Sequence, residues 1–100
     1  MKVRFLTLAQ QELDDTVNWY NEQVNGLGQE FLDELDRAVR RSVIFPLSCP
    51  EIEPGLRRCL LARFPYGLIY GLEGETIIIV AVAHLHRRPR YWADRLSQEG

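Results

Sequence analysis

The chain has 100 residues, of which 46% are hydrophobic and 26% are charged, and its formal net charge is -2 at neutral pH. This composition is typical of one soluble domain, residues 1–100, that can bury a core without metals or disulfides. The longest apolar run, residues 77–83, is strand-sized, which excludes a membrane-spanning helix of about 20 apolar residues. Lys2 and Arg4 lead into a short alternating segment rather than an apolar leader, which predicts a cytoplasmic protein.

The N-terminal part predicts a strand followed by a helix. Residues 2–7 alternate from side to side as a short strand does. Thr7 and Gln10 have the spacing of a capping box, so we expect Thr7 to cap a helix that ends at Asn25-Gly26. The inward side of this helix is predicted to carry Leu13, Val17, Tyr20 and Val24.

A second helix is predicted to begin near Gly28 and to stop by Pro46. Acidic residues fall early in this segment and arginines fall late, which suits the helix dipole. Only a tight turn separates the two helices, so they are expected to form an antiparallel hairpin. The predicted buried stripe is Phe31, Leu35, Ala38 and Ser42, and the predicted outer side is Glu30, Asp33, Glu34, Arg37, Arg40 and Arg41.

Three strands are expected after a proline-rich connection, at residues 57–64, 67–72 and 76–86. Their short connections favour antiparallel pairing, and the apolar run makes the last strand central. Pro89 is placed to begin a short terminal helix. The predicted fold class is therefore α+β with the order βααβββ: an antiparallel sheet, a helical hairpin on one face and a short C-terminal helical turn.

Charge is distributed unevenly along the chain. Residues 1–56 carry five basic and ten acidic side chains, whereas residues 57–95 carry seven arginines and three carboxylates. All the positive charges of the second segment are arginines, whose planar groups bind carboxylates and phosphates in bidentate fashion. We therefore expect the C-terminal part to form a cationic face for an anionic partner; the alternative is that the arginines only solvate a sheet surface.

The chain contains two cysteines, Cys49 and Cys59, and two histidines, His84 and His86. The cysteines could pair, but a cytoplasmic chain normally keeps its thiols reduced, so both are interpreted as packing residues. The four side chains could in principle bind zinc, but their spacing matches no paired-cysteine or helical histidine motif. The sequence therefore predicts no metal and no other cofactor.

The two histidines are predicted to leave the last strand on one side, beside Arg87 and Arg88. An imidazole in such a place suits a general base at neutral pH. The alternative is that both rings only form hydrogen bonds at a sheet edge, and the pattern favours neither.

Several short motifs occur in a fixed order along the predicted elements. They are Trp19-Tyr20, Phe31-Leu32, Leu35, Pro46, Arg57-Arg58, Phe64-Pro65-Tyr66, Ile69-Tyr70 and a final segment with His84, Arg87-Arg88-Pro89 and Tyr91-Trp92. Their ordered combination, over nearly the whole chain, resembles the RelE/ParE family of bacterial toxins. The resemblance implies a twisted antiparallel sheet with the hairpin on one side. It also implies a type II toxin that a cognate antitoxin neutralises by direct binding.

The family divides by target: ParE-like members poison DNA gyrase, whereas RelE-like members cut ribosome-bound mRNA without a metal. The long hairpin with its Asp14-Asp15 segment, and a single lysine, Lys2, resemble the ParE-like branch and imply gyrase. A third alternative is a remnant that binds its antitoxin and is not toxic. If the chain were instead an endonuclease, His84 or His86 would be the acid or base, and Arg63 with Arg87 or Arg88 would clamp the phosphate. Tyr91 would be a stacking or proton-handling ring, and the predicted catalytic set is His84, Arg63, Arg87 and Tyr91.

The resemblance and the arginines together imply a contact surface for an acidic, partly apolar antitoxin segment. Such a segment is expected to lie across the sheet and the hairpin, and to become ordered as a toxin–antitoxin hetero-oligomer forms. The predicted partner-binding residues are Arg57, Arg58, Arg63, Arg88, Trp92 and Arg95.

Overall fold

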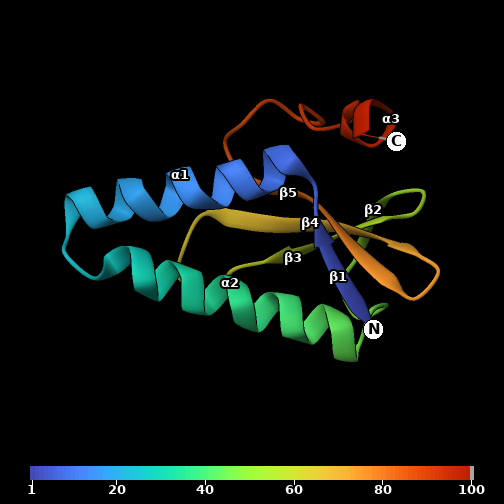
Figure 1. Cartoon of the computed structure of the whole chain (residues 1–100), viewed down its shortest axis with the longest axis horizontal. Coiled ribbons are helices and arrows are strands. Elements are labelled where there is room, and N and C mark those ends of the chain that lie inside the picture. The colour runs from blue at the N-terminus through green and yellow to red at the C-terminus, as the bar shows by residue number, and fades with distance from the viewer. Residues whose placement is uncertain (100) are drawn as a thin grey trace.

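The computed structural model describes residues 1–99 and the side chains of residues 1–97. Its helices and strands follow one another as Figure 1 shows. In chain order they are β1 (Lys2–Phe5), α1 (Thr7–Gln23), α2 (Leu27–Ile44), β2 (Glu51–Glu53), β3 (Leu56–Leu60), β4 (Tyr66–Glu73), β5 (Thr76–His84) and α3 (Arg95–Glu99).

The five strands among residues 1–99 form one sheet in the order β1-β5-β4-β3-β2. β5 is central, and its residues from Ile77 to Ala83 are buried, as predicted. β2 to β5 pair antiparallel, whereas β1 lies parallel to β5 because the chain crosses over through the hairpin before it returns to the sheet. The α+β fold class is confirmed, and the sheet is mixed at β1.

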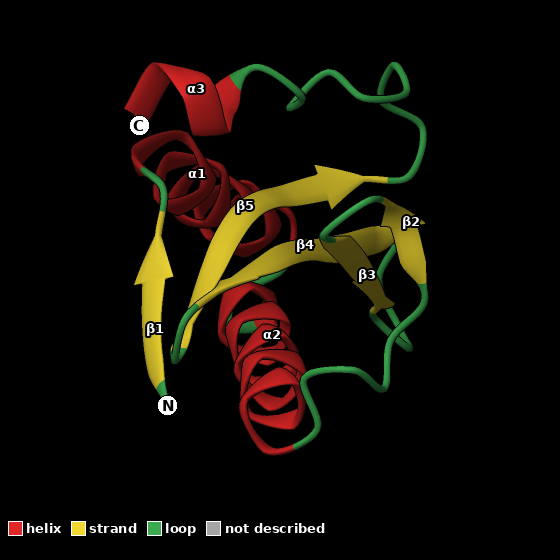
Figure 2. Ribbon diagram, turned by 90° about the vertical axis from the view of Figure 1, so that its right-hand side faces the viewer, coloured by secondary structure: helices red, strands yellow, loops and turns green. Residues whose placement is uncertain are grey.

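Helix α2 and the C-terminal segment cover opposite sides of the sheet (Figure 2). Figure 2 shows α2 on one side of β4 and β5, and the segment from residue 85 onward on the other. We call these sides the inner face and the outer face. The turn between α1 and α2 lies at the end of the molecule opposite both labelled termini (Figure 1). None of the helices within residues 1–99 is long and apolar enough to cross a membrane.

Gly28 lets the two helices approach closely. A Cβ at this position would overlap with the carbonyl of Val17 and the side chain of Asn21. The Gly28 backbone N–H instead donates to Asn21 Oδ1 at 2.8 Å. α2 begins at Leu27 directly after Gly26, whose φ of 88° lies in the left-handed region that suits glycine.

An aromatic cluster joins the hairpin to the inner face. The ring centroid of Phe31 lies 5.1 Å from those of Phe64 and Tyr66, and the Tyr20 ring lies 5.0 Å from Phe64. Most of these contacts are edge-to-face, the arrangement that aromatic pairs prefer. The predicted buried stripe of α2 is confirmed, with Phe31, Leu35, Ala38 and Ser42 all buried.

Two predictions about the helices are wrong. Thr7 is the first residue of α1 rather than its cap, because Leu6 is still bonded to Ile79 of β5 and takes the N-cap position with an extended backbone. Val24 is 59% exposed rather than inward, since α1 ends at Gln23.

The strand boundaries also differ from the predicted ones. β2 was not expected; it forms because the chain returns alongside β3, where the Pro50 carbonyl accepts from the Arg58 N–H at 3.0 Å. β3 ends at Leu60 because the chain then bends to bury Phe64. α3 begins at Arg95 rather than Pro89, since the positive φ of Arg90, 59°, interrupts a right-handed helix.

Cys49 and Cys59 form a disulfide, with Cα atoms 5.4 Å apart. The prediction that both are reduced packing residues is therefore wrong. The loop after α2 folds back over β3, which brings together two residues that are 10 positions apart. This return of the chain depends on tertiary contacts that residue spacing does not reveal.

Candidate functional site

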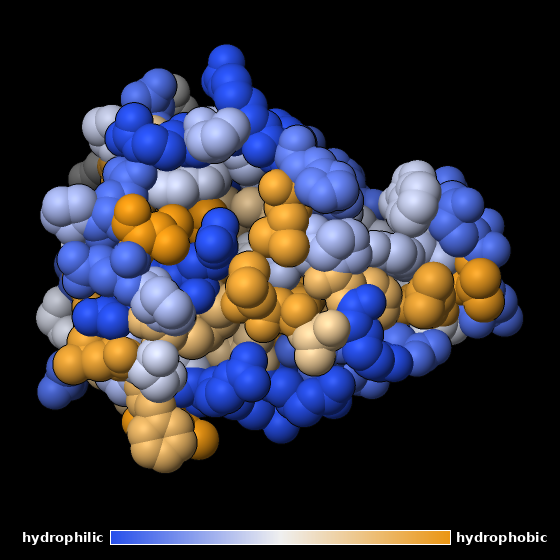
Figure 3. All heavy atoms as spheres, turned by 180° about the vertical axis from the view of Figure 1, so that it is seen from behind, coloured by the Kyte–Doolittle hydropathy of each residue, from blue (hydrophilic) through white to orange (hydrophobic). Residues whose placement is uncertain are grey.

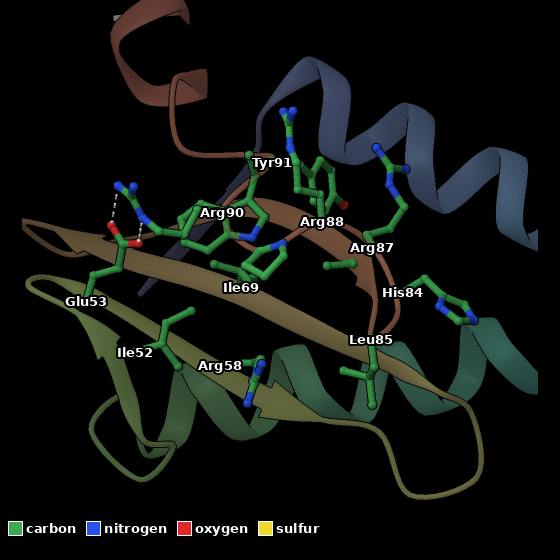
Figure 4. A pocket seen from close by; sticks show the side chains of 13 residues that line it. Ile52, Glu53, Arg58, Ile69, His84, Leu85, Arg87, Arg88, Arg90 and Tyr91 are labelled. Carbon is green, nitrogen blue, oxygen red and sulfur yellow. Dashed lines mark hydrogen bonds and ion pairs between the residues drawn. The ribbon is translucent and has the colours of Figure 1, made fainter.

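A pocket of about 250 Å³, which we call the outer pocket, lies between the outer face and the C-terminal segment (Figure 4). Short turns after β5 place several charged side chains at its rim. It combines an apolar floor with arginines, an arrangement suited to an acidic and partly apolar ligand. Its lining consists of Ile52, Glu53, Arg58, Ile69, Ala83, His84, Leu85, Arg87, Arg88, Pro89, Arg90, Tyr91 and Trp92.

Arg58 projects from β3 onto the outer face. It pairs with Ile69 of β4, and its stem lies over Gly67, where a Cβ would come within 3.0 Å of two of its carbons. Glycine at this position therefore makes room for the arginine. Within the described residues, the Arg58 guanidinium group forms no hydrogen bond or ion pair, so it is free to bind a ligand.

Arg57, the next residue along β3, lies on the opposite face. Its Nη1 donates to the carbonyls of Leu47 at 3.1 Å and Cys49 at 2.8 Å, and its Nη2 lies 3.5 Å from Glu51 Oε2. Alternation along a strand explains the separation of Arg57 from Arg58. Arg57 therefore holds the loop before β2.

Arg63 joins the β3–β4 connection to α2. Its backbone N–H and its Nε donate to the two oxygens of Glu34, at 2.8 and 3.0 Å, and its Nη1 donates to Glu30 at 3.1 Å. Glu34 is buried, which corrects its predicted place on the outer side of the second helix. Burial alone would raise the pKa of Glu34, but the hydrogen bonds from Arg63 outweigh it and lower the pKa.

The lowered pKa of Glu34 predicts a pH-dependent contribution to stability. At neutral pH, Glu34→Gln should cost about 1–2 kcal/mol of unfolding free energy, since the charge-assisted bonds weaken. In the folded protein, Glu34 becomes protonated only at a pH below its ordinary pKa of 4.5, and protonation weakens its bonds to Arg63. The stability difference between the native protein and Glu34→Gln should therefore shrink as the pH falls below 4.5. Urea denaturation of both proteins across this range tests it, with the exposed Glu22→Gln as control. A deficit that stays constant down to acid pH would contradict the prediction.

Glu12 binds the edge of β5 where β1 has ended. β1 pairs with β5 only as far as Ile79, and Val80 then forms a bulge opposite Tyr70. Glu12 Oε1 accepts from the N–H of Val82 at 3.0 Å, and Arg95 Nη1 donates to the Val80 carbonyl at 3.1 Å. Two side chains thus satisfy backbone groups that a longer β1 would have bonded.

Glu12 also binds two side chains of the C-terminal segment. Arg95 donates to both of its carboxylate oxygens, at 2.8 and 2.9 Å, and the Tyr91 hydroxyl donates to Oε2 at 2.6 Å. Burial, followed by the bond to Glu12, raises the pKa of Tyr91 well above its ordinary 10.0. The phenol therefore stays protonated at neutral pH and acts as a donor.

The remaining residues of the segment have distinct surroundings. Trp92 is buried, and the Arg87 guanidinium lies 4.0 Å from the centre of the Tyr91 ring. Arg90 donates to both oxygens of Glu53, at 2.6 and 3.3 Å, which holds its left-handed backbone in place. The Arg88 carbonyl accepts from the Tyr91 N–H at 3.2 Å, but the Arg88 guanidinium group forms no hydrogen bond or ion pair in the part of the chain that the structure describes.

The two histidine rings lie together at the end of β5. Their centroids are 5.1 Å apart, and the backbone N–H of His86 donates to His84 Nδ1 at 3.0 Å. The His84 ring also contacts that of Tyr66 edge-on at 5.0 Å. Whether either histidine takes part in catalysis stays a prediction. Among the described side chains, those of residues 1–97, no group of three or more His, Cys, Asp or Glu is placed to hold a metal.

The expectation of one continuous cationic sheet face is wrong. Of the seven C-terminal arginines, four are paired with carboxylates, and the guanidinium groups that line the outer pocket point in different directions (Figure 4). The acidic partners lie on other elements, at positions that the charge count could not connect. Within residues 1–97, the guanidinium groups of Arg58 and Arg88 have no hydrogen-bond or ion-pair partner, and that of Arg87 stacks on the Tyr91 ring.

Exposed apolar side chains accompany these arginines. The face seen in Figure 3, on the side where β2 and β3 lie, has apolar groups near its centre with hydrophilic groups around them. Sequence reasoning missed the contribution of Ile52 and Glu53 to the pocket because it did not predict β2. The exposed large apolar residues of β2, β3 and the turn directly after β5 are Ile52, Leu60 and Leu85.

Comparisons with known proteins agree with the predicted resemblance. A family model described as ParE toxin of type II toxin-antitoxin system, parDE, matches residues 3–89. No curated protein has a detectably similar sequence. A solved structure titled "Chromosomal ParDE TA system from P. aeruginosa" has a similar fold, with a TM-score of 0.75 and 18% identity over 86% of this chain and 97% of that chain. Because the family model spans most of its length, this chain belongs to the ParE toxin family of type II toxin–antitoxin systems.

Proposed function

We propose that this toxin inhibits bacterial growth by binding DNA gyrase in the cytoplasm, and that a cognate antitoxin neutralises it by direct contact. The observation that carries the proposal is the ParE family match over residues 3–89. The long α1–α2 hairpin, of the kind expected for ParE-like members, adds support.

The contacts of the endonuclease candidates support gyrase over RNA cleavage. Metal-free cleavage needs a base, an acid and a phosphate clamp around one phosphate. Arg63 is ion-paired with α2 and lies outside the outer pocket that His84, Arg87 and Tyr91 line. The Tyr91 hydroxyl donates to Glu12 and has a raised pKa, so it is a poor proton acceptor. The four candidate side chains therefore do not line one pocket.

For the antitoxin, the proposal is that an acidic, partly apolar segment contacts the outer pocket around Arg58. Arg58 and Arg88 have no carboxylate partner among the described residues, whereas the other predicted arginines are already paired. Leu60 and Leu85 are 53% and 44% exposed and offer apolar contacts. An antitoxin segment could bind Arg58 through a carboxylate and place apolar side chains against Leu60 and Leu85 on either side of it.

Supercoiling by purified gyrase tests the proposed target. Adding the purified toxin should reduce supercoiling in proportion to its concentration, and adding the cognate antitoxin should restore it. In cells, induction should activate DNA-damage signalling and leave message ends unchanged. Undiminished supercoiling together with new mRNA ends that disappear in His84→Ala would favour the endonuclease. Normal growth after induction would favour the non-toxic remnant.

The same assay tests the antitoxin contact. Arg58→Glu should raise the antitoxin concentration needed for relief about tenfold or more, since it reverses a charge at the contact. Arg4→Glu, the same change on the opposite edge strand β1, should leave that concentration unchanged. Equal relief of both variants would rule out the outer pocket as the antitoxin site.

A further inference from the structure

The Cys49–Cys59 disulfide is accessible from a second pocket. This pocket, of about 340 Å³, shares Arg58 and Ile52 with the outer pocket, and both cysteines line it. Cys59 is 2% exposed, whereas Cys49 is only partly buried. A small molecule in this pocket therefore has better access to Cys49.

The surroundings of the disulfide are positively charged. Arg41 from α2 and Arg58 from β3 line the same pocket. None of the described acidic residues lines it. Disulfide exchange proceeds through attack by a thiolate, and it is faster where the leaving thiolate is stabilised. The two arginines of the pocket therefore favour the approach of an anionic thiol.

The disulfide also holds one wall of the outer pocket. The disulfide attaches the loop between α2 and β2 covalently to β3. Hydrogen bonds also hold this loop, for example those from Arg57 and the one from the Tyr70 hydroxyl to the Pro46 carbonyl at 2.7 Å. The same segment continues into β2, where Ile52 and Glu53 line the outer pocket. Glu53 in turn binds Arg90 on the opposite wall (Figure 4).

We propose that Cys49–Cys59 is an exchangeable disulfide that a small anionic thiol, of which glutathione is an example, attacks at Cys49. The incoming thiolate forms a bond to Cys49 Sγ, the Cys49–Cys59 bond breaks, and Cys59 leaves as a thiolate that takes a proton from water. A second thiolate then attacks the glutathione sulfur, so that Cys49 is released and oxidised glutathione forms. The protein disulfide gains two electrons, two thiols lose them, and the β2 wall is loosened.

Trapping of the mixed disulfide tests the point of attack. The native protein is treated with reduced glutathione, quenched in acid and mapped by peptide mass spectrometry, which should place glutathione on Cys49. With oxidised glutathione, Cys59→Ser should be modified at Cys49 at least about tenfold faster than Cys49→Ser is modified at Cys59. Modification mainly at Cys59, in either experiment, would overturn the assignment.

A change of thiol tests the role of charge. Arg41→Gln combined with Arg58→Gln should slow reduction by glutathione several-fold and leave reduction by neutral 2-mercaptoethanol less affected. Equal slowing with both thiols would contradict electrostatic recruitment. Reduction that occurs only at the rate of global unfolding, measured by pulse proteolysis, would contradict exchange in the folded protein.

Hydrogen exchange tests the effect on the outer pocket. Amides of residues 51–53 should exchange at least about tenfold faster in the reduced protein than in the oxidised one, because the covalent attachment is lost. Amides of the central run, residues 77–83, should keep their protection and serve as the internal control. Unchanged exchange at residues 51–53 would show that the disulfide does not hold this wall.

Discussion

Replacing Glu12 by alanine is expected to lower the free energy of unfolding by about 3 kcal/mol, a large share of the roughly 5–15 kcal/mol typical of a small domain. The substitution leaves the Arg95 guanidinium, whose side chain is 10% exposed, without its carboxylate. It also removes the acceptor for the Val82 N–H and the Tyr91 hydroxyl. A buried charge without a partner destabilises the folded state by more than the intact ion pair stabilises it. The loss of unfolding free energy should therefore be large.

Urea denaturation of Glu12→Ala, Arg95→Ala and the double variant measures this effect. The double variant should be less destabilised than the sum of the single ones, since removing both charges leaves neither unpaired. Glu22→Ala, the same change at an exposed position of the same helix, is the control and should cost less than about 0.5 kcal/mol. Equal costs for Glu12→Ala and Glu22→Ala would show that the contacts of Glu12 contribute nothing.

Gly28→Ala should destabilise the protein by about 1–3 kcal/mol, or more if the hairpin cannot adjust. In an exposed helix the same change stabilises by about 1 kcal/mol, so the sign of the effect is diagnostic. The new Cβ would overlap with the Val17 carbonyl and the Asn21 side chain. The two helices would have to separate, which would disturb the aromatic cluster on the inner face.

Two further variants separate the sources of this strain. Adding Asn21→Ala to Gly28→Ala relieves the side-chain overlap but not the overlap with the Val17 backbone, so stability should recover only in part. Gln29→Ala, at the exposed neighbouring position, should have little effect. Thermal and urea unfolding report the stabilities. A Gly28→Ala protein that is more stable than the native chain would mean that the helices have room at this crossing.

The sequence predicted the elements with strong periodicity. The apolar run from Ile77 to Ala83 indicated a central strand, and the stripe that contains Phe31 and Leu35 indicated the inner side of α2, because local spacing sets which face a residue occupies. The parallel pairing of β1 was missed, since alternation gives no strand direction. β2 was missed because three residues beside prolines carry no periodic signal.

The candidate site was harder to predict because its contacts connect distant parts of the chain. Glu12 and Arg95 are 83 positions apart, and Arg90 and Glu53 are 37 positions apart. The charge count identified the arginines but could not show which of them had carboxylate partners. Alternation along a strand places Arg57 and Arg58 on opposite faces of β3, although both were predicted to bind one partner surface.

The parallel pairing of β1 with β5 affects how the chain folds as the ribosome makes it. Residues 2–5 pair with residues 76–79, and Glu12 contacts Val82, Tyr91 and Arg95, so these N-terminal residues find all their partners only after residue 95 has been made. The hairpin is synthesised before strands β2 to β5, and contacts between residues so far apart in sequence form slowly. A nascent chain that ends before residue 76 therefore has the hairpin but lacks the strand that holds β1.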